Sequence, residues 1–292
     1  MLFSKITDAR DGLYPALRQT LSILQTELPE NRFRRSSKIL QIVAEIIEID
    51  VDAIYDALVD TTWPRSELPL IHGHGNFGFP PAHPDFSEIK LSDFCKGIIN
   101  GKTILDFSQP LSVPIPYALV CGTLGYSQSV SKIPSHNLGE VIDAAIALIK
   151  DPTLKTEQLL QIVKGPDLLV GGMIENPEEL CSIYESGQGI IKVIVTPDTI
   201  NNRFFDTAKN YGVWYGTKIR KVRMKDAYRL EIPYQALLSD GTQTRLMSLD
   251  DMLRVFIDYY KAVKAMTSDD ELCLSLSKYK ELSSARKTFH HF

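Results

Sequence analysis

Three helical patterns in close succession near the start of the chain set the first limit on its fold. The first has apolar residues repeating with a period near 3.6 between Leu13 and Leu28. Pro15 lies early enough in this stretch to occupy a first helical turn, where proline is tolerated. A long amphipathic helix is therefore expected here.

The next two helical patterns are short and closely coupled. Ser36 is an expected N-cap ahead of an apolar set made of Ile39, Ile42, Val43 and Ile46. The pattern breaks near Asp50, and a further helix is expected from Asp52 to about Thr61. A longer helix followed by two short ones is similar to a helix-turn-helix core.

The rest of the chain mixes further helices with strands. Residues 64–84 are rich in Gly, Pro and His, which is typical of a loop or a tight β-ribbon. The other expected elements are helices at 90–99, 137–150, 155–163 and 248–266, strands at 102–107, within 187–198 and within 214–241, and a helix-capable tail after Thr267. The class predicted is α+β, with helices first.

Composition narrows the class of protein. A chain of 292 residues that is 44% hydrophobic can bury a sizeable core and form two modest domains. Its net charge of −4 excludes a uniformly basic surface, so a grip on nucleic acid has to come from local basic patches. No stretch approaches the roughly 18 apolar residues of a membrane span, and the start lacks a signal-peptide core. A cytoplasmic protein without a membrane partner is expected.

The four cysteines favour no disulfide framework and no zinc site. They are scattered without CxxC spacing, which fits buried or idle thiols in a reducing compartment; they are Cys95, Cys121, Cys181 and Cys273. His72, His74 and His83 could meet as metal ligands only if their loop folded back, and no acidic partner lies at helical spacing. No metal site is expected.

Eight short stretches occur in one order: "DARDGLYPALRQTL", "FRRSSKILQIVAEII", "AIYDALV", "PLIHGHGNFG", "SEIKLS", "KIPSHNLGEVIDAAIALIKDP", "IVKGPDLLVGGMI" and "YESGQGIIKV". Together they resemble the breakage-reunion region of the A subunit of bacterial type IIA topoisomerases, the gyrase and topoisomerase IV family. The match runs with gaps from about Asp8 to Ile194, and "ALLSDGTQTRLMSLDDMLRVFIDYYKAV" is similar to the family's return into a long coiled coil.

The resemblance implies an architecture and partners. It implies a winged-helix domain at 1–110, a tower-like α/β domain at 111–240, and a remnant of the coiled-coil-entry helix with a tail at 241–292. It also implies a homodimer astride double-stranded DNA and possible pairing with a topoisomerase A or B subunit. The chain begins close to "DARDG" and ends soon after its last helix starts, so a truncated relative is expected.

The family's arginine-tyrosine pair falls on Asp85 and Phe86, between "NFG" and "SEIKLS". Attack on a phosphodiester needs an oxygen nucleophile with a neighbouring cation, whereas phenylalanine has no oxygen and aspartate repels phosphate. A shifted alignment does not restore the nucleophile, because no tyrosine occurs between Tyr55 and Tyr117. No catalytic residue is therefore expected, and the alternative role for Phe86 is packing in a small core.

Two further departures concern the recognition turn and the cofactors. The family's histidine-containing turn is shortened here to "IEIDVDAIYD". The chain has no Walker-type loop and no Asp-x-Asp cluster, so no cofactor is expected in it. If an activity remained, Mg²⁺ and ATP would come only through a B-type partner.

The candidate DNA-binding residues are mostly basic. Four of them crowd the start of an expected helix, where side-chain cations and free backbone N–H groups can both reach phosphates; they are Arg32, Arg34, Arg35 and Lys38. The resemblance adds Arg18, Lys90 and His136, and it identifies Ile133 with an isoleucine wedge that unstacks a base step. The alternatives are a solvated basic run for the four cations and core packing for Ile133.

A second basic run would place Lys221, Arg223 and Lys225 on one face of a strand, where they could equally be a charged sheet edge.

Three functions remain open from the sequence. The first is a topoisomerase-A-like protein that binds DNA without cutting it. The second is an active topoisomerase subunit that works with a B-type partner and an unorthodox nucleophile. The third is a decoy that pairs with a genuine A subunit. Affinity for DNA that falls steeply with salt favours the first, and a covalent protein–DNA adduct favours the second.

Overall fold

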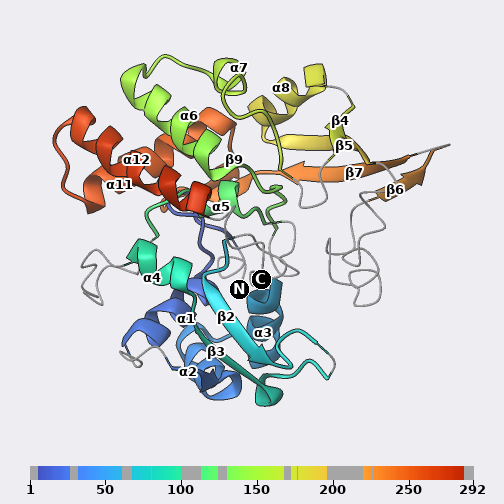
Figure 1. Ribbon diagram of the computed structural model, residues 1–292, viewed down its shortest axis with the longest axis vertical. Coiled ribbons are helices and arrows are strands. Elements are labelled where there is room, and N and C mark those ends of the chain that lie inside the picture. Colours follow the sequence, from blue (N-terminus) through green and yellow to red (C-terminus); the bar gives the residue numbers. More distant parts are fainter. Residues whose placement is uncertain are drawn as a thin grey trace.

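The structure is a computed structural model that describes residues 6–26, 32–60, 68–79, 81–99, 113–123, 130–167, 172–175, 177–195, 220–224 and 227–285. Helices and antiparallel sheets are combined in two layers (Figure 1), so the predicted α+β class is confirmed at this level. The lower layer contains the first three helices and a three-stranded sheet, and the upper layer contains a four-stranded sheet with most of the later helices.

The lower layer packs two helices directly against an antiparallel sheet of order β1-β3-β2, and a third helix packs on those two. Its elements are α1 (Pro15–Thr26), β1 (Arg34–Arg35), α2 (Ser36–Ile47), α3 (Val51–Asp60), β2 (Ile71–Gly75), the 3-10 turn η2 (Pro84–Phe86) and β3 (Ser87–Leu91). Leu17, Leu21 and Leu24 bury one face of α1, and Pro15 begins this helix as predicted.

Helix α2 differs from its prediction at its cap and on its apolar face. Arg35, not Ser36, is the N-cap residue, because the Ser36 hydroxyl accepts a hydrogen bond from the Ser87 hydroxyl at 2.9 Å. Ile39 and Val43 are buried, but Ile42 and Ile46 are 42% and 52% exposed. The predicted apolar stripe was therefore too wide, since only part of it meets α1 and α3.

A three-residue turn separates α2 from α3. Helix α2 ends at Ile47, and its C-cap residue Glu48 has the left-handed conformation. The Asp50 carboxylate then accepts hydrogen bonds from the amides of Asp52 and Ala53 and so caps α3. This arrangement fits the predicted break near Asp50.

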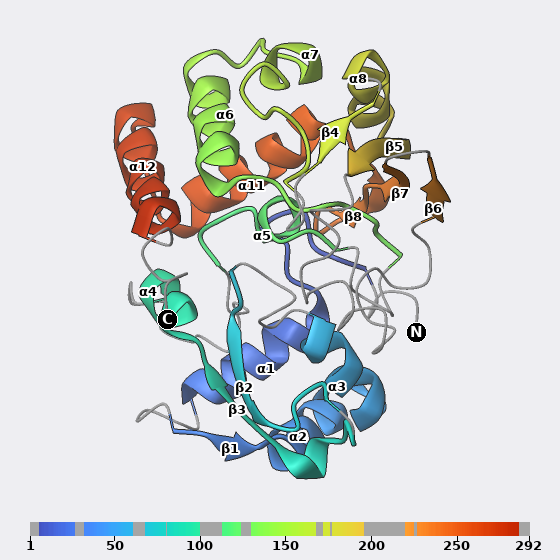
Figure 2. The same ribbon diagram turned by 45° about the vertical axis from the view of Figure 1, so that its right-hand side comes forward.

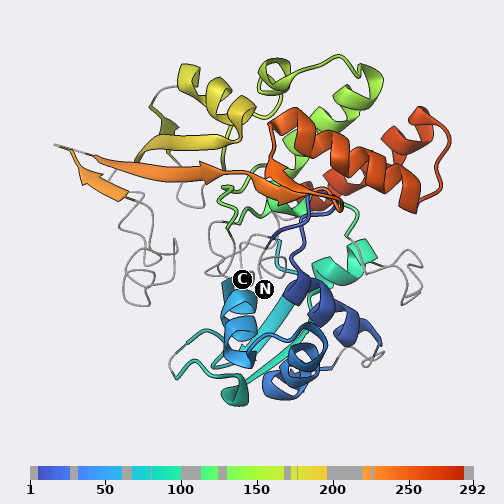
Figure 3. The same ribbon diagram turned by 180° about the vertical axis from the view of Figure 1, so that it is seen from behind.

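The upper layer holds an antiparallel sheet of order β4-β5-β7-β6, whose strands β7 and β6 extend away from the rest of the molecule (Figure 3). Its elements are α5 (Tyr117–Val120), α6 (Leu138–Lys150), α7 (Thr156–Leu159), β4 (Met173–Ile174), α8 (Pro177–Ser186), β5 (Gln188–Val195), β6 (Arg220–Arg223), β7 (Tyr228–Gln235), β8 (Leu237–Ser239), β9 (Thr244–Leu246), α11 (Leu249–Val263) and α12 (Asp269–Ala285). Helix α8 packs on β5, and α11 packs on α6.

Side-chain caps confirm two predicted helix starts. Asn137 accepts a hydrogen bond from the Glu140 amide at the start of α6, and Ser248 accepts one from the Asp251 amide at the start of α11. The tail after Thr267 forms α12, which lies beside α6 (Figure 2) and joins it through an ion pair between Lys280 and Asp143.

Three other predicted elements differ from the structure or lie outside the described residues. Helix α4 spans Asp93–Ile99, because the start of the expected helix at 90–99 belongs to β3. Helix α7 covers only part of the expected 155–163. The strand expected at 102–107 lies outside the described residues.

The first described residues tie the two layers together. The Ala9 amide donates to the Ser239 carbonyl at 2.7 Å, and the Ser239 amide donates to the Thr7 carbonyl at 3.0 Å. Two residues further on, the Asp11 carbonyl accepts from the amide of Tyr117 at 3.0 Å. Residues 7–9 thus pair with β8 of the hairpin β8–β9, and Asp11 bonds the first residue of α5.

None of the helices in the described ranges is both long enough and apolar enough to cross a membrane. The four cysteines are free thiols. Burial alone raises the pKa of the Cys95 thiol far above its ordinary value, so this thiol stays protonated in the core.

Candidate nucleic-acid interface

The basic start of α2 is exposed and its backbone is fixed. The side chains of Arg32, Arg34, Arg35 and Lys38 all lie at the surface. Strand β1 carries two of them and pairs with β3, with Arg34 opposite Ile89 and Arg35 opposite Glu88. The structure therefore brings the four predicted cations together on one short segment, attached to a rigid sheet.

Position 86 lies directly beside this segment. The turn η2, which ends at Phe86, contacts both β1 and the start of α2, and the Ser87–Ser36 hydrogen bond joins the two segments. The Phe86 side chain is 58% exposed. The alternative that placed it in a small core is therefore wrong: this segment offers the ring too few buried neighbours.

The residue before Phe86 faces a histidine instead of a phosphate-binding cation. The Asp85 amide donates to Nδ1 of His83 at 3.2 Å, and the Asp85 carboxylate lies 3.6 Å from the same nitrogen. Both side chains are about half exposed, at 49% for His83 and 55% for Asp85. The local pair has a carboxylate where attack on a phosphodiester needs a cation.

The two tyrosines that flank this region in the sequence are not available as substitutes. The Tyr55 hydroxyl accepts from the Gly78 amide at 3.1 Å and lies 3.4 Å from the Asn76 carbonyl, and Tyr55 is only 2% exposed. Tyr117 is fully buried and donates to the Leu68 carbonyl at 3.0 Å. Both hydroxyls are occupied inside the core.

Lys90 is half-buried in a ring cluster on the face of the sheet. Its ammonium lies 4.6 Å from the centre of the Phe33 ring, and that ring also packs against His72 and His74 at 5.4 and 5.1 Å. Burial, helped by the nearby Lys90 charge, lowers the pKa of His72 below its ordinary value. Lys90 is thus held by a cation–π contact, which sequence reasoning missed.

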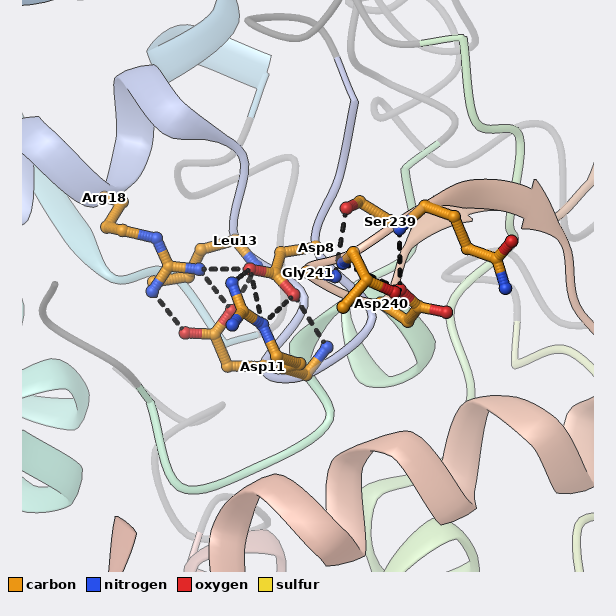
Figure 4. A network of polar contacts seen from close by, with 10 residues as sticks. Asp8, Asp11, Leu13, Arg18, Ser239, Asp240 and Gly241 are labelled. Carbon is orange, nitrogen blue, oxygen red and sulfur yellow. Dashed lines mark hydrogen bonds and ion pairs between the residues drawn. The ribbon is translucent and has the colours of Figure 1, made fainter. Parts of the chain in front are cut away.

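Arg18 is an internal ion-pair partner, not a DNA contact (Figure 4). Its guanidinium donates to both oxygens of Asp11 at 2.6 and 2.7 Å and reaches Asp8 at 3.3 Å. Burial alone lowers the pKa of Arg18, but the two carboxylates outweigh it and the pKa is raised. Arg10 completes the network through Asp8 at 2.7 Å. The predicted phosphate contact is corrected, because this cation is already neutralised in the interior.

Ile133 and His136 are also buried, against their predicted roles at DNA. Ile133 is 0% exposed, and its amide and carbonyl both bond Thr123. His136 is 3% exposed and lies between the Leu119 carbonyl and the Tyr184 hydroxyl. In this arrangement neither side chain reaches solvent, so the core alternative for Ile133 describes the structure and the wedge does not.

The exposed face of α3 is acidic. Asp52 and Asp56 are exposed on it, with Glu48 and Asp50 exposed in the preceding turn. Phosphates are repelled by this face and attracted by the start of α2. The exposed positive charge of this layer is thus concentrated on β1 and the start of α2, not on α3.

The second basic run and the three histidines offer less evidence of a binding site. In the second basic run, Arg223 is exposed at the end of β6, while Lys218 and Lys225 lie outside the described residues. His72 and His74 lie on β2 and His83 precedes η2. Across the described part of the chain, no group of three or more His, Cys, Asp or Glu side chains is placed to hold a metal ion.

Known proteins are similar in sequence to this region of the chain. Residues 5–210 match the family model for the A subunit of DNA gyrase/topoisomerase IV. The chain is 34% identical over 211 residues to the A subunit of DNA topoisomerase 4 from Synechocystis sp., covering 64% of this chain and 23% of that protein. It is 34% identical over 233 residues to the A subunit of DNA gyrase from Thermotoga maritima, covering 71% of this chain and 29% of that protein. The matches thus span about a quarter of the length of these curated relatives.

Proposed function

Because the chain belongs to the family of DNA gyrase/topoisomerase IV A subunits, we propose that it binds double-stranded DNA without cutting it. The family membership confirms the resemblance that the ordered motifs indicated. The absence of cleavage is our own inference from the residues at positions 85 and 86.

One juxtaposition supports the proposal most directly. The exposed cations Arg34, Arg35 and Lys38 lie beside a turn that presents the exposed ring of Phe86. The cations can neutralise phosphates of a nucleic-acid backbone that passes beside this turn. The ring itself has no oxygen with which to attack phosphorus. A site of this kind holds a backbone and leaves it intact.

The architecture fits the same proposal. We assign the lower layer to a winged-helix domain, in which α2 and α3 form the helix-turn-helix and the loop between β2 and β3 forms the wing. The order α1, β1, α2, α3, β2, β3 and the sheet order β1-β3-β2 support this assignment. The predicted boundaries at 110 and 240, with a tower-like domain between them, remain part of the proposal.

A homodimer is proposed from the exposed face of α2. Ile42 and Ile46 are one helical turn apart and both are exposed. Pairing of this face with a second copy covers both isoleucines.

Enzyme activity with a partner remains the competing function. If a B-type subunit supplied Mg²⁺ and ATP, cleavage would still need an oxygen nucleophile near η2. The burial of the Tyr55 and Tyr117 hydroxyls argues against either residue. We therefore propose no cofactor for this chain.

The test of DNA binding is its salt dependence. Titration of a labelled duplex at several salt concentrations should give a linear fall of log affinity with log salt. The variants Arg34→Gln, Arg35→Gln and Lys38→Gln should each reduce the slope by about 0.9. Lys164→Gln, an exposed lysine of the upper layer, is the matched control and should leave the slope unchanged. Salt-independent binding, or equal slopes in all variants, contradicts the proposal.

The test of cleavage uses a B-type subunit of a bacterial topoisomerase with Mg²⁺ and ATP. After denaturation of the mixture with a 5′- and 3′-labelled duplex, no label should remain attached to the protein. A labelled adduct that disappears on substitution of one residue of this chain would establish the competing function instead.

A further inference from the structure

The Phe86 ring is exposed on a backbone that is held in place on both sides. Its amide donates to the His83 carbonyl at 3.1 Å, and its carbonyl accepts from the Asn76 amide at 3.0 Å. The next residue, Ser87, is buried and bonds Ser36. These contacts hold the backbone of residue 86 in place, and the ring stands on it at the surface.

An exposed aromatic ring on a backbone held in this way marks a contact surface, because burying it against a ligand is favourable. We propose that Phe86 is a stacking residue that receives an unpaired nucleobase, so that the protein prefers DNA containing an interrupted base step over a continuous duplex. This inference rests on the proposed DNA binding and specifies which form of DNA is bound.

The groups around the ring favour a base as the occupant. The carboxylate of Asp85 repels a phosphate placed directly at the ring, and phenylalanine offers it no hydrogen bond. A base presents a neutral π-face, for which an aromatic ring is a sequence-tolerant partner. The imidazole of His83, whose ring centre lies 5.8 Å from that of Phe86 at an angle of 53°, adds a second ring at one side.

Phosphates adjoining such a base meet favourable charges. The segment that carries Arg34, Arg35 and Lys38 contacts η2, so these exposed cations are carried next to the turn that bears the ring. The backbone of an unpaired nucleotide can therefore bind these side chains while its base covers the ring. This division separates the charge contacts from the stacking contact, and the two can be tested apart.

An unpaired base is a more favourable ligand for the ring than a paired base, because less energy is needed to remove it from the DNA stack. In a continuous duplex each base is already stacked on both neighbours, and extracting it costs energy. At a single unpaired nucleotide this cost is lowest, so the stacking on Phe86 is gained almost in full. The preference should appear as a ratio of two affinities measured for otherwise identical DNA.

The experiment compares a labelled continuous duplex with the same duplex carrying one unpaired adenine at its centre. We expect the wild-type protein to bind the interrupted duplex about tenfold more tightly. Phe86→Ala should reduce this ratio to near one, while Phe86→Trp, which keeps an aromatic ring, should retain it. Met173→Ala removes another exposed apolar side chain, 69% exposed on β4, and should leave the ratio unchanged.

The outcomes separate this inference from the proposed function. A ratio that stays near tenfold in Phe86→Ala overturns the stacking role. A wild-type ratio near one, with salt-sensitive duplex binding intact, also overturns it but leaves the proposed function standing. Loss of all salt-sensitive binding in the wild type contradicts the proposed function itself. A folded state of Phe86→Ala is verified by an unchanged unfolding midpoint.

Discussion

The imidazole of His136 accepts a hydrogen bond from the hydroxyl of Tyr184 in the core of the upper layer. Nδ1 of His136 lies 2.9 Å from the Leu119 carbonyl, which can only accept, so Nδ1 carries the proton and Nε2 is the acceptor. The sequence resemblance assigns this histidine to DNA. Its contacts instead make it a buried, neutral link between α5 and α8.

Acid should weaken the fold through His136. Burial lowers the pKa of this imidazole to about 4, against about 6.5 when the chain is unfolded. The unfolded state therefore binds the proton more readily between these values, and stability is lost as the pH falls from about 6.5 to about 4. The loss should reach about 3 kcal/mol, measured as the free energy of unfolding in urea at several pH values.

The matched variants for this prediction are His136→Gln and His83→Gln. His136→Gln should remove most of the pH dependence in this window, whereas His83→Gln changes a half-exposed side chain and should keep it. An unchanged pH profile in His136→Gln would contradict the assignment.

Removing the partner of the buried Asp11 should be costly. The Asp11 side chain is 0% exposed and Arg18 holds it through two hydrogen bonds. Arg18→Met leaves that carboxylate unpaired in the interior and should destabilise the protein by about 3–5 kcal/mol, read from urea unfolding. The control is Arg10→Met, whose cation is 36% exposed and should cost less than about 1 kcal/mol. Equal costs for the two variants would rule out a special role for the buried pair.

Two glycines should respond to alanine in opposite directions. Gly12 has φ +84, and an added Cβ would lie 2.0 Å from the backbone nitrogen of Ala118. Gly12→Ala should therefore cost at least about 2 kcal/mol. Gly97 lies in α4 with nothing within 4 Å of an added Cβ, so Gly97→Ala should stabilise the protein by roughly 0.5–1 kcal/mol. Thermal unfolding midpoints decide both, and a stable Gly12→Ala protein would show that the contact between residue 12 and α5 is loose.

The proposed dimer should depend on the exposed isoleucines of α2. Ile42→Glu and Ile46→Glu place charges in the contact that would face a second copy and should weaken self-association at least tenfold in sedimentation experiments. Leu274→Glu, at a 64% exposed position of α12, is the control and should have no effect. A wild-type protein that stays monomeric at high concentration would remove the dimer from the proposal, and pairing only with a genuine A subunit would redirect it to a decoy.

Local signals made a good part of the fold predictable. Asn137 and Ser248 cap helices because short polar side chains before an apolar periodic run satisfy the free amides of the first turn. Pro15 begins α1 for a similar local reason. Strand β5 follows from a run of Ile and Val residues, and β7 from Leu230, Ile232 and Tyr234 at every second position. None of these features needs knowledge of a distant partner.

Burial at the candidate site was not predictable from the same signals. The sequence predicts that Arg18 and His136 contact DNA at the surface. The tertiary fold instead brings Asp11 to Arg18 and Tyr184 to His136 in the interior. Conversely, the ring of Phe86 has the character of a core residue, yet η2 provides it with no cover. The basic cluster was found because its four members are nearly adjacent along the chain.

The pairing of Ala9 with Ser239 has a consequence for how the polypeptide matures. Because a ribosome releases residue 9 long before residue 239, the leading edge emerges with its eventual neighbour not yet translated. The docking of the lower layer against the upper one is thus a late event, completed only when the hairpin β8–β9 has left the exit tunnel. Until then, nascent chains expose the surfaces that this pairing closes.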